Sequence, residues 1–189
     1  MNLEYWREID KNAEKPMFDF EEQYQRFANE LPDGCRIAEV GVSNGKSALF
    51  LASKLAEQGK EFEMDMIDNL DYGKDFQMKV ILQNIVNSGI PNINFIPKDS
   101  LNACAGYPDD LFDMVYLDSS HLYQETKSEI RCWVHKIKNG GILAGHDANY
   151  QEVLDAIQHT VPLEILNIEE TKHNWGMWWF RKTENLIIK

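Results

Sequence analysis

Short apolar segments alternate with longer amphipathic ones along most of this chain, and five of the short ones end on an acid, a His-Asp pair or a glycine loop. The short segments have the length and composition of strands, and the longer ones carry apolar residues at helical spacing. The predicted strands cover residues 37–42, 62–67, 93–96, 112–117, 142–145, 163–166 and 177–180. Strands that alternate with helices predict an α/β fold with a parallel sheet and helices on both faces. Because such sheets bind ligands beyond the carboxyl ends of their strands, we expect the polar strand ends to form one site.

The amphipathic segments between these strands are expected to form the helices. They cover residues 46–58, 76–86, 123–138 and 150–161. The Gly140-Gly141 pair is expected to end the third helix. Residues 1–34 also read as helical, and their apolar stripe consists of Met17, Phe18, Phe20, Tyr24 and Phe27. We predict an N-terminal helical segment, residues 1–32, packed on a ligand-binding domain formed by residues 33–189.

Length and charge limit the classes of partner. A chain of 189 residues fits one domain. The net charge of −12 repels phosphate backbones and anionic membranes, so we expect no nucleic-acid partner. No run reaches the roughly 20 apolar residues that a membrane span requires, and residues 1–8 lack the apolar core of a signal peptide. We therefore expect no membrane association and a cytoplasmic location.

The three cysteines lie far apart in the sequence, at positions 35, 104 and 132. No Cys-x-x-Cys pair is present, so neither a zinc ribbon nor a redox motif is indicated. Cys35 and Cys132 fall inside apolar runs, where buried thiols are common. Since a domain of this size can bury a sizeable core, we expect it to fold without a disulfide in a reducing compartment.

The loop after the first predicted strand, residues 39–45, is the first candidate for ligand binding. Gly41 allows a sharp turn at the strand end, and Gly45 allows a ligand to lie close to the backbone. The fingerprint Gly-x-Gly-x-x-Gly is absent, so a dinucleotide pyrophosphate at the helix start is not favoured. Glu39, just before the loop, instead suits a cationic ligand such as S-adenosylmethionine. Taken alone, the loop is equally consistent with a glycine-rich structural turn.

Acids at the next two strand ends add to this interpretation. Asp68 follows the second strand, where a carboxylate can accept hydrogen bonds from both hydroxyls of a ribose. Asp99 and Ser100 follow the third strand, where a side-chain oxygen can receive the amino group of adenine. The alternative for each is a helix cap or a turn residue.

Several of these segments resemble the successive motifs of class I methyltransferases. The matching segments are residues 39–45, 66–68, Asp99 and residues 115–118. Residues 118–123 and 140–147 are more specific, since they are similar to the Asp-x-x-His-x-Tyr and Gly-Gly-x-x-x-Gly-His-Asp pair of a bacterial branch, methyltransferase domain 24. The resemblance covers roughly residues 33–182.

The resemblance implies a Rossmann-like fold with a seven-stranded, mostly parallel sheet whose last strand is antiparallel, with helices on both faces. It implies S-adenosylmethionine as cofactor. By resemblance, Gly41, Ser43 and Gly45 line the methionine part of this cofactor. Asp68 would bind its ribose and Asp99 its adenine.

Asp118, His146 and Asp147 converge if the fourth and fifth strands end side by side. Two carboxylates and an imidazole form a candidate site for a divalent metal. Oxygen ligands suit Mg²⁺, whereas the imidazole would favour Mn²⁺, Fe²⁺ or Zn²⁺. A metal there would bind a hydroxylated acceptor, lower the pKa of one hydroxyl and orient it toward the methyl group.

The alternative without a metal assigns Asp118 to the cofactor and makes His121 or His146 the general base. Methylation of a hydroxyl requires removal of its proton, and histidine titrates near neutrality. Tyr72 and Trp175 are candidates for aromatic walls of the pocket. In the closing strand, alternation places Trp178 and Phe180 on one face and Trp179 on the other. These aromatic residues fill the core or form the contact of a homodimer.

The expected function is therefore S-adenosylmethionine-dependent methylation of a small hydroxylated acceptor. One alternative is a non-catalytic module that binds the cofactor but has lost the acceptor site. Another is a nicotinamide-dependent oxidoreductase, against which the missing fingerprint and Glu39 count. Nucleic-acid methylation is disfavoured by the net charge of −12.

Overall fold

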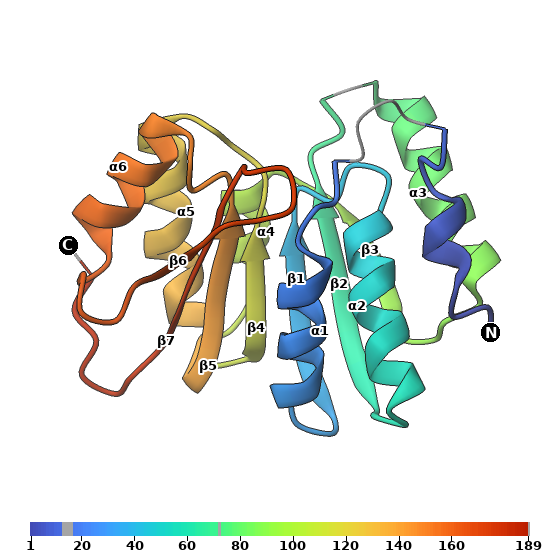
Figure 1. Cartoon of the computed structure of the whole chain (residues 1–189), viewed down its shortest axis with the longest axis horizontal. Helices are drawn as coiled ribbons and strands as arrows, with labels where there is room; N and C mark the ends of the chain where they lie inside the picture. The colour runs from blue at the N-terminus through green and yellow to red at the C-terminus, as the bar shows by residue number, and fades with distance from the viewer. Residues whose placement is uncertain (13–16, 72, 189) are drawn as a thin grey trace.

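The computed structural model describes residues 1–12, 17–71 and 73–188, and a single seven-stranded sheet forms its centre (Figure 1). The strands follow the order β3-β2-β1-β4-β5-β7-β6. β1 to β5 are parallel, whereas β7 is antiparallel to both of its neighbours. The strands are β1 (Cys35–Val40), β2 (Phe62–Asp68), β3 (Ile93–Pro97), β4 (Phe112–Leu117), β5 (Ile137–His146), β6 (Asn167–Glu169) and β7 (Met177–Arg181). The strand order reverses between β1 and β4. The predicted fold class is confirmed, and this reversal is the place where such sheets commonly bind ligands.

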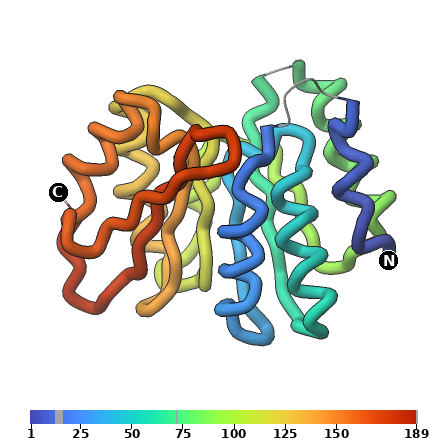
Figure 2. The backbone as a smooth tube through the Cα atoms, in the orientation of Figure 1, coloured from blue at the N-terminus to red at the C-terminus, as the bar shows by residue number. Residues whose placement is uncertain are grey.

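Helices cover both faces of the sheet (Figures 1 and 2). They are the 3₁₀-helix η1 (Tyr5–Glu8) and the α-helices α1 (Glu21–Glu30), α2 (Lys46–Glu57), α3 (Lys74–Ser88), α4 (Ser100–Cys104), α5 (Tyr123–Lys136) and α6 (Gln151–Thr160). One core lies between the sheet and the group η1, α1, α2 and α3. A second core lies between the opposite face and the group α4, α5 and α6. Within the described residues, no helix is long and apolar enough to span a membrane.

Beyond the N-terminal region, three parts of the predicted element order differ from the structure. β5 begins at Ile137, so Gly140 and Gly141 lie inside the strand and do not separate it from α5. The pairing of β4 with β5 shifts its register after Phe112, and Gly140 takes a φ of +81° at this irregularity. No strand forms at residues 163–166, where Leu163 is exposed, and the short β6 follows instead. The short helix α4 was not predicted.

The N-terminal region is not one continuous helix. It consists of η1 and α1 joined by non-helical residues, of which 13–16 lie outside the described part of the chain. Phe18, Phe20, Tyr24 and Phe27 are buried, as predicted for the apolar stripe, but Met17 is 65% exposed. The region packs on the sheet, since the Phe20 ring stacks on Tyr116 of β4 at 4.9 Å. The division of the chain at residue 32 stays a prediction.

The cysteine prediction is wrong for one pair. Cys104 at the end of α4 and Cys132 in α5 form a disulfide across 28 residues of sequence. Neither spacing nor composition marks these two cysteines as partners. Cys35, by contrast, is a buried free thiol, as expected.

The closing strand β7 confirms the predicted alternation. Trp178 and Phe180 lie in the core beneath α5 and α6. Trp179 points to the other face, where its ring meets Phe27 of α1 at 5.9 Å. Core packing therefore accounts for these aromatic residues, and the homodimer contact stays a prediction.

Candidate active site

A cleft of about 400 Å³ opens at the carboxyl ends of the strands, where the strand order reverses. This volume lies within the usual range for small-molecule sites. Its lining comes from the glycine loop, the ends of β2 to β5, the N-terminal segment and the loop before β7. The predicted site residues in this lining are Gly41, Ser43, Asp68, Asp99, Ser100, Asp118, His121, His146 and Asp147. Trp175 also lines the cleft, whereas Tyr72 lies outside the described residues.

The glycine loop requires glycine for a steric reason. Gly41 has a φ of +85°, and a Cβ atom there would lie 2.1 Å from the carbonyl oxygen of Asp118. Gly45 has a φ of +82° and forms the N-cap of α2. The loop therefore crosses directly over the end of β4, which brings the glycine loop next to Asp118.

Asp68 ties the glycine loop to β2. Its Oδ2 atom accepts a hydrogen bond from the backbone N–H of Ser43 at 3.0 Å. Its Oδ1 atom accepts from the backbone N–H of Leu70 at 2.8 Å and from Nε2 of Gln77 at 3.2 Å. Asp68 is only 8% exposed, yet it borders the cleft. The acid thus shapes the loop, and its role toward a ribose stays a prediction.

Asp99 and Ser100 also have structural partners. Asp99 is the N-cap of α4, since its Oδ1 atom accepts hydrogen bonds from the backbone N–H groups of Leu101 and Asn102. The Oγ atom of Ser100 accepts a hydrogen bond from Nε1 of Trp133 at 3.0 Å. Both residues line the cleft at the end of β3. Their predicted contact with adenine is compatible with this position and stays a prediction.

Glu39 does not line the cleft, so the structure does not bring it to the ligand as we predicted. The residue is 1% exposed, and its carboxylate turns toward α1 and α2. There it accepts hydrogen bonds from the hydroxyls of Tyr24 and Ser47. Burial raises the pKa of Glu39 to about 7, although these two hydrogen bonds act in the opposite direction. Strand alternation explains the correction, because neighbouring residues of β1 face opposite sides of the sheet.

His146 lies inside a cage of three carboxylates. Its Nε2 atom is 2.9 Å from Oδ1 of Asp19, and its Nδ1 atom is 3.6 Å from Asp118 and 3.5 Å from Asp147. Burial alone would lower the pKa of His146, but the hydrogen bonds with these acids raise it to about 12. Both ring nitrogens of His146 therefore face carboxylates. The predicted roles of His146 as general base and as metal ligand stay predictions.

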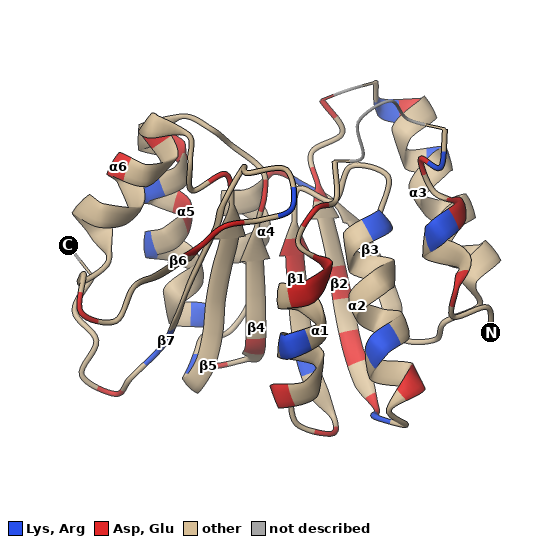
Figure 3. Cartoon of the chain, in the orientation of Figure 1, with Lys and Arg blue, Asp and Glu red and all other residues tan. Residues whose placement is uncertain are grey.

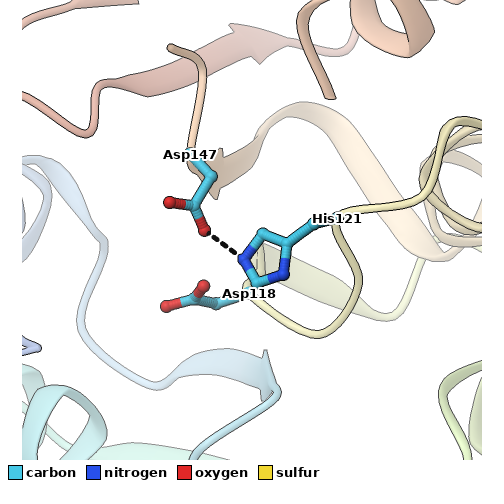
Figure 4. A group of neighbouring side chains, drawn as sticks. All are labelled: Asp118, His121 and Asp147. Carbon is cyan, nitrogen blue, oxygen red and sulfur yellow. Dashed lines mark hydrogen bonds and ion pairs between the residues drawn. The ribbon is translucent and has the colours of Figure 1, made fainter. Parts of the chain in front are cut away.

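Asp118, His121 and Asp147 converge at the mouth of the cleft (Figure 4). One potential ligand atom from each lies within 4.8 Å of the others. The Nε2 atom of His121 is 2.7 Å from Oδ2 of Asp147, and this hydrogen bond raises the pKa of His121. Burial would raise the pKa of Asp147, but its bonds with His121 and His146 hold it well below the usual range. The His121 side chain is 51% exposed, so it remains accessible to an incoming molecule.

The same three side chains match the donor set of a divalent cation. Two carboxylates and one imidazole suit Mn²⁺, Fe²⁺ or Zn²⁺ better than Mg²⁺. His121 supplies the imidazole here, in the place that we had predicted for His146.

Asp19 is a site residue that the sequence analysis missed. It lies in the N-terminal segment, is 3% exposed and contacts His146 across 127 residues of sequence. No motif includes it. The one available signal was a lone acid inside the apolar run Met17-Phe18-Asp19-Phe20, because a buried acid needs a partner.

Comparison with known proteins agrees with this geometry. A family model described as Methyltransferase domain (Methyltransf_24) matches residues 38–148, which is more than half of the chain. Curated protein sequences give no significant match. Solved structures share the fold at low sequence identity. A SAM-dependent O-methyltransferase from Thermotoga maritima is 16% identical over 95% of this chain and 71% of its own, with a TM-score of 0.69.

Two further structures show the breadth of the fold. The cofactor-bound protein Rv0187 from MTB is 15% identical over 97% of this chain and 90% of its own, with a TM-score of 0.72. An rRNA methylase from Streptococcus thermophilus is 16% identical over 91% of this chain and 99% of its own, with a TM-score of 0.64. The family match favours methyl transfer over the nicotinamide-dependent and non-catalytic alternatives. The chain belongs to this methyltransferase domain family and is an S-adenosylmethionine-dependent methyltransferase.

Proposed function

We propose that this enzyme methylates a hydroxyl group of a small acceptor, with His121 as the general base. The observation that carries the proposal is the 2.7 Å contact between His121 Nε2 and Asp147 Oδ2 beside Asp118 in the cleft. A histidine oriented by a carboxylate is a common arrangement for proton removal. The O-methyltransferase from Thermotoga maritima, which has the same fold, gives further support.

The proposed reaction requires one proton transfer and one methyl transfer. The acceptor oxygen forms a bond with the methyl carbon while the bond between that carbon and the sulfonium sulfur breaks. The hydroxyl proton moves to His121. Because Nε2 faces Asp147, Nδ1 is the nitrogen that takes the proton. The carboxylate of Asp147 then stabilises the imidazolium, as the raised pKa of His121 indicates.

The cofactor would occupy the part of the cleft next to the glycine loop. We assign Gly41, Ser43 and Gly45 to its methionine part, and Asp68 to its ribose. Asp99 and Ser100 are assigned to the adenine, and Asp118 to the region of the sulfonium. All of these residues except Gly45 line the cleft, and Gly45 ends the same loop.

A divalent metal is the second candidate for activating the acceptor. Asp118, His121 and Asp147 would hold it, in place of the predicted set Asp118, His146 and Asp147. Bound there, a metal ion supplies charge that lowers the pKa of an acceptor hydroxyl. If a metal is required, a chelator should abolish methylation. If His121 is the base without a metal, a chelator should leave the activity unchanged.

A small acceptor fits the size and charge of the protein better than a nucleic acid does. The cleft of about 400 Å³ must also accommodate the cofactor. Lysine and arginine positions are scattered among acidic ones over both halves of the described chain (Figure 3), and the net charge is −12. A nucleic acid would need a basic surface to offset its phosphates. The rRNA methylase of similar fold makes this alternative worth testing.

The proposal is tested in two steps. Calorimetric titration with S-adenosylhomocysteine should show binding, and no binding at millimolar ligand would remove the assigned cofactor site. A panel of catechols, sugars and a ribosomal RNA fragment is then incubated with S-adenosylmethionine, in EDTA and with Mn²⁺ or Mg²⁺. Methylation of a small hydroxylated compound in EDTA supports the histidine base. Activity only with added metal supports the metal site, and methylation of the RNA alone contradicts the small acceptor.

A further inference from the structure

Asp19 joins three segments of the chain at the back of the cleft. Its side chain is fully buried. The Oδ1 atom lies 2.9 Å from Nε2 of His146, at the end of β5. The Oδ2 atom accepts a hydrogen bond from Oγ1 of Thr171 at 2.6 Å and another from the backbone N–H of His173 at 2.9 Å. The N-terminal segment, β5 and the loop before β7 therefore meet at one carboxylate.

A line of alternating acids and imidazoles leads from Asp19 to the proposed base. His146 contacts Asp19 through one ring nitrogen, and it contacts Asp147 and Asp118 through the other. Asp147 in turn contacts His121 through the same oxygen, Oδ2. Asp19 and His146 are shielded from solvent, whereas His121 is exposed at the mouth of the cleft.

The orientation of the His146 ring depends on Asp19. Phe20 and Trp175 pack against the ring at centroid distances of 4.9 and 5.6 Å, so they confine it without setting which nitrogen faces which acid. The contact of Nε2 with Asp19, at 2.9 Å the shortest of the three, holds the ring with Nδ1 toward Asp118 and Asp147. Two neighbouring carboxylates repel each other when no cation lies between them. The position of His146 therefore decides how Asp118 and Asp147 are held.

We propose that Asp19 is a positioning residue for methyl transfer, because it orients His146, which holds Asp147 and thereby the base His121. This inference rests on the proposed role of His121. It makes the N-terminal segment part of the active site, although the predicted motifs all lie between residues 39 and 147.

A purely structural role of Asp19 makes a different prediction. In that case the residue would only anchor the loop before β7 through Thr171 and His173. D19N separates the two roles, since its amide oxygen can still accept both of these hydrogen bonds. Its NH₂ group faces His146 in place of an acceptor. T171V is the matched control, because it removes an anchor of the loop and leaves the contact between Asp19 and His146 in place.

The first measurement is steady-state kinetics with the acceptor found in the panel. We expect D19N to lower kcat about 10- to 100-fold, which is the usual loss when a partner that orients a functional side chain is removed. The KM for the acceptor and the Kd for S-adenosylhomocysteine should stay at wild-type values, which also shows that the variant is folded. T171V should retain kcat. Unchanged kcat in D19N, or an equal loss in T171V, overturns the inference.

The second measurement needs no acceptor. Crystal structures of wild type and D19N with S-adenosylhomocysteine should show the His146 ring turned in the variant and the contact between His121 and Asp147 longer than 2.7 Å. An unmoved ring and an unchanged contact overturn the inference. If the wild type methylates no compound of the panel, the proposed function fails, and the crystal structures still decide the role of Asp19.

Discussion

The two halves of the cleft are built in different ways. The cofactor half consists of backbone turns at strand ends, and its polar side chains also bind nearby backbone groups, as Asp68 binds Ser43 and Leu70. The transfer half consists of side chains that come from distant parts of the sequence and bind one another, as Asp19, His146 and Asp147 do. Backbone geometry therefore sets the first half, and a charge network sets the second. Substitutions in the two halves should accordingly affect different properties.

Replacement of His121 tests the transfer half and should have the largest effect. H121A removes the proposed base, and loss of a general base typically lowers the rate by about 10²- to 10⁴-fold. The side chain is half exposed, so stability and the Kd for S-adenosylhomocysteine should change little. H135A, at an exposed position of α5, is the control and should leave kcat unchanged. If H121A stays fully active, His121 is not the base.

Replacement of Gly41 tests the cofactor half. In G41A the new methyl group would lie 2.1 Å from the Asp118 carbonyl oxygen at a φ of +85°. We expect a loss of about 3 kcal/mol or more in the free energy of unfolding, the magnitude typical of severe steric mutations. Binding of S-adenosylhomocysteine should be lost as well. G34A has a similar φ of +74° but no atom within 4 Å, so it should cost only about 1 kcal/mol. If G41A and G34A lose the same free energy of unfolding in urea denaturation, the close approach of Gly41 to the end of β4 is unimportant for stability.

Glu39 lies beneath the glycine loop and gives the cofactor half a pH dependence. Its pKa is raised from 4.5 to about 7, so the folded state favours the protonated acid. The contribution of protonated Glu39 to the stability of the folded state is fully present below pH 4.5 and is lost as the pH rises through about 7. At pH 8, E39Q should be more stable relative to wild type than at pH 5, by up to about 3 kcal/mol. If the free energies of unfolding of E39Q and wild type, measured in urea, change with pH in parallel, the raised pKa of Glu39 is contradicted.

Asp68 should show the smallest effect of the four. In D68A the loop loses the hydrogen bond to Ser43, and the cofactor loses the proposed acceptor for its ribose. A charge-assisted hydrogen bond is worth about 1.5–3 kcal/mol, which corresponds to a roughly 10- to 100-fold weaker Kd for S-adenosylhomocysteine. Titration with methionine, which has no ribose, separates the two losses. A weaker Kd for methionine reports the altered loop, whereas a weaker Kd for S-adenosylhomocysteine alone reports the lost ribose contact. An unchanged Kd for S-adenosylhomocysteine would remove Asp68 from the cofactor site.

The sequence predicted the features that depend on neighbouring residues. β4 begins and ends where its apolar run does, at Phe112 and Leu117. The glycine loop and the acids at the strand ends lie in the cleft because a parallel sheet brings its carboxyl ends together. These features follow from local spacing and from one rule of topology.

The remaining features depend on distant partners and were missed for that reason. His146 and His121 follow equally suggestive motifs, and only the contact with Asp19 shows that His146 is fully engaged. Glu39 is polar and stands before the loop, but its partner Tyr24 lies on a helix whose packing the sequence does not specify. The pairing of Cys104 with Cys132 likewise depends on how α4 lies against α5.

The disulfide between α4 and α5 fixes one wall of the cleft. Ser100 of α4 and Glu129 of α5 belong to one wall of the cleft, and Cys104 and Cys132 join these two helices covalently. This wall cannot part between the helices while the bond is intact. Elsewhere in the lining, an exposed hydrogen bond from Asn44 Nδ2 to Asp10 Oδ1 joins the glycine loop to the N-terminal segment. Any widening of the cleft that breaks no covalent bond therefore has to come from other parts of its lining.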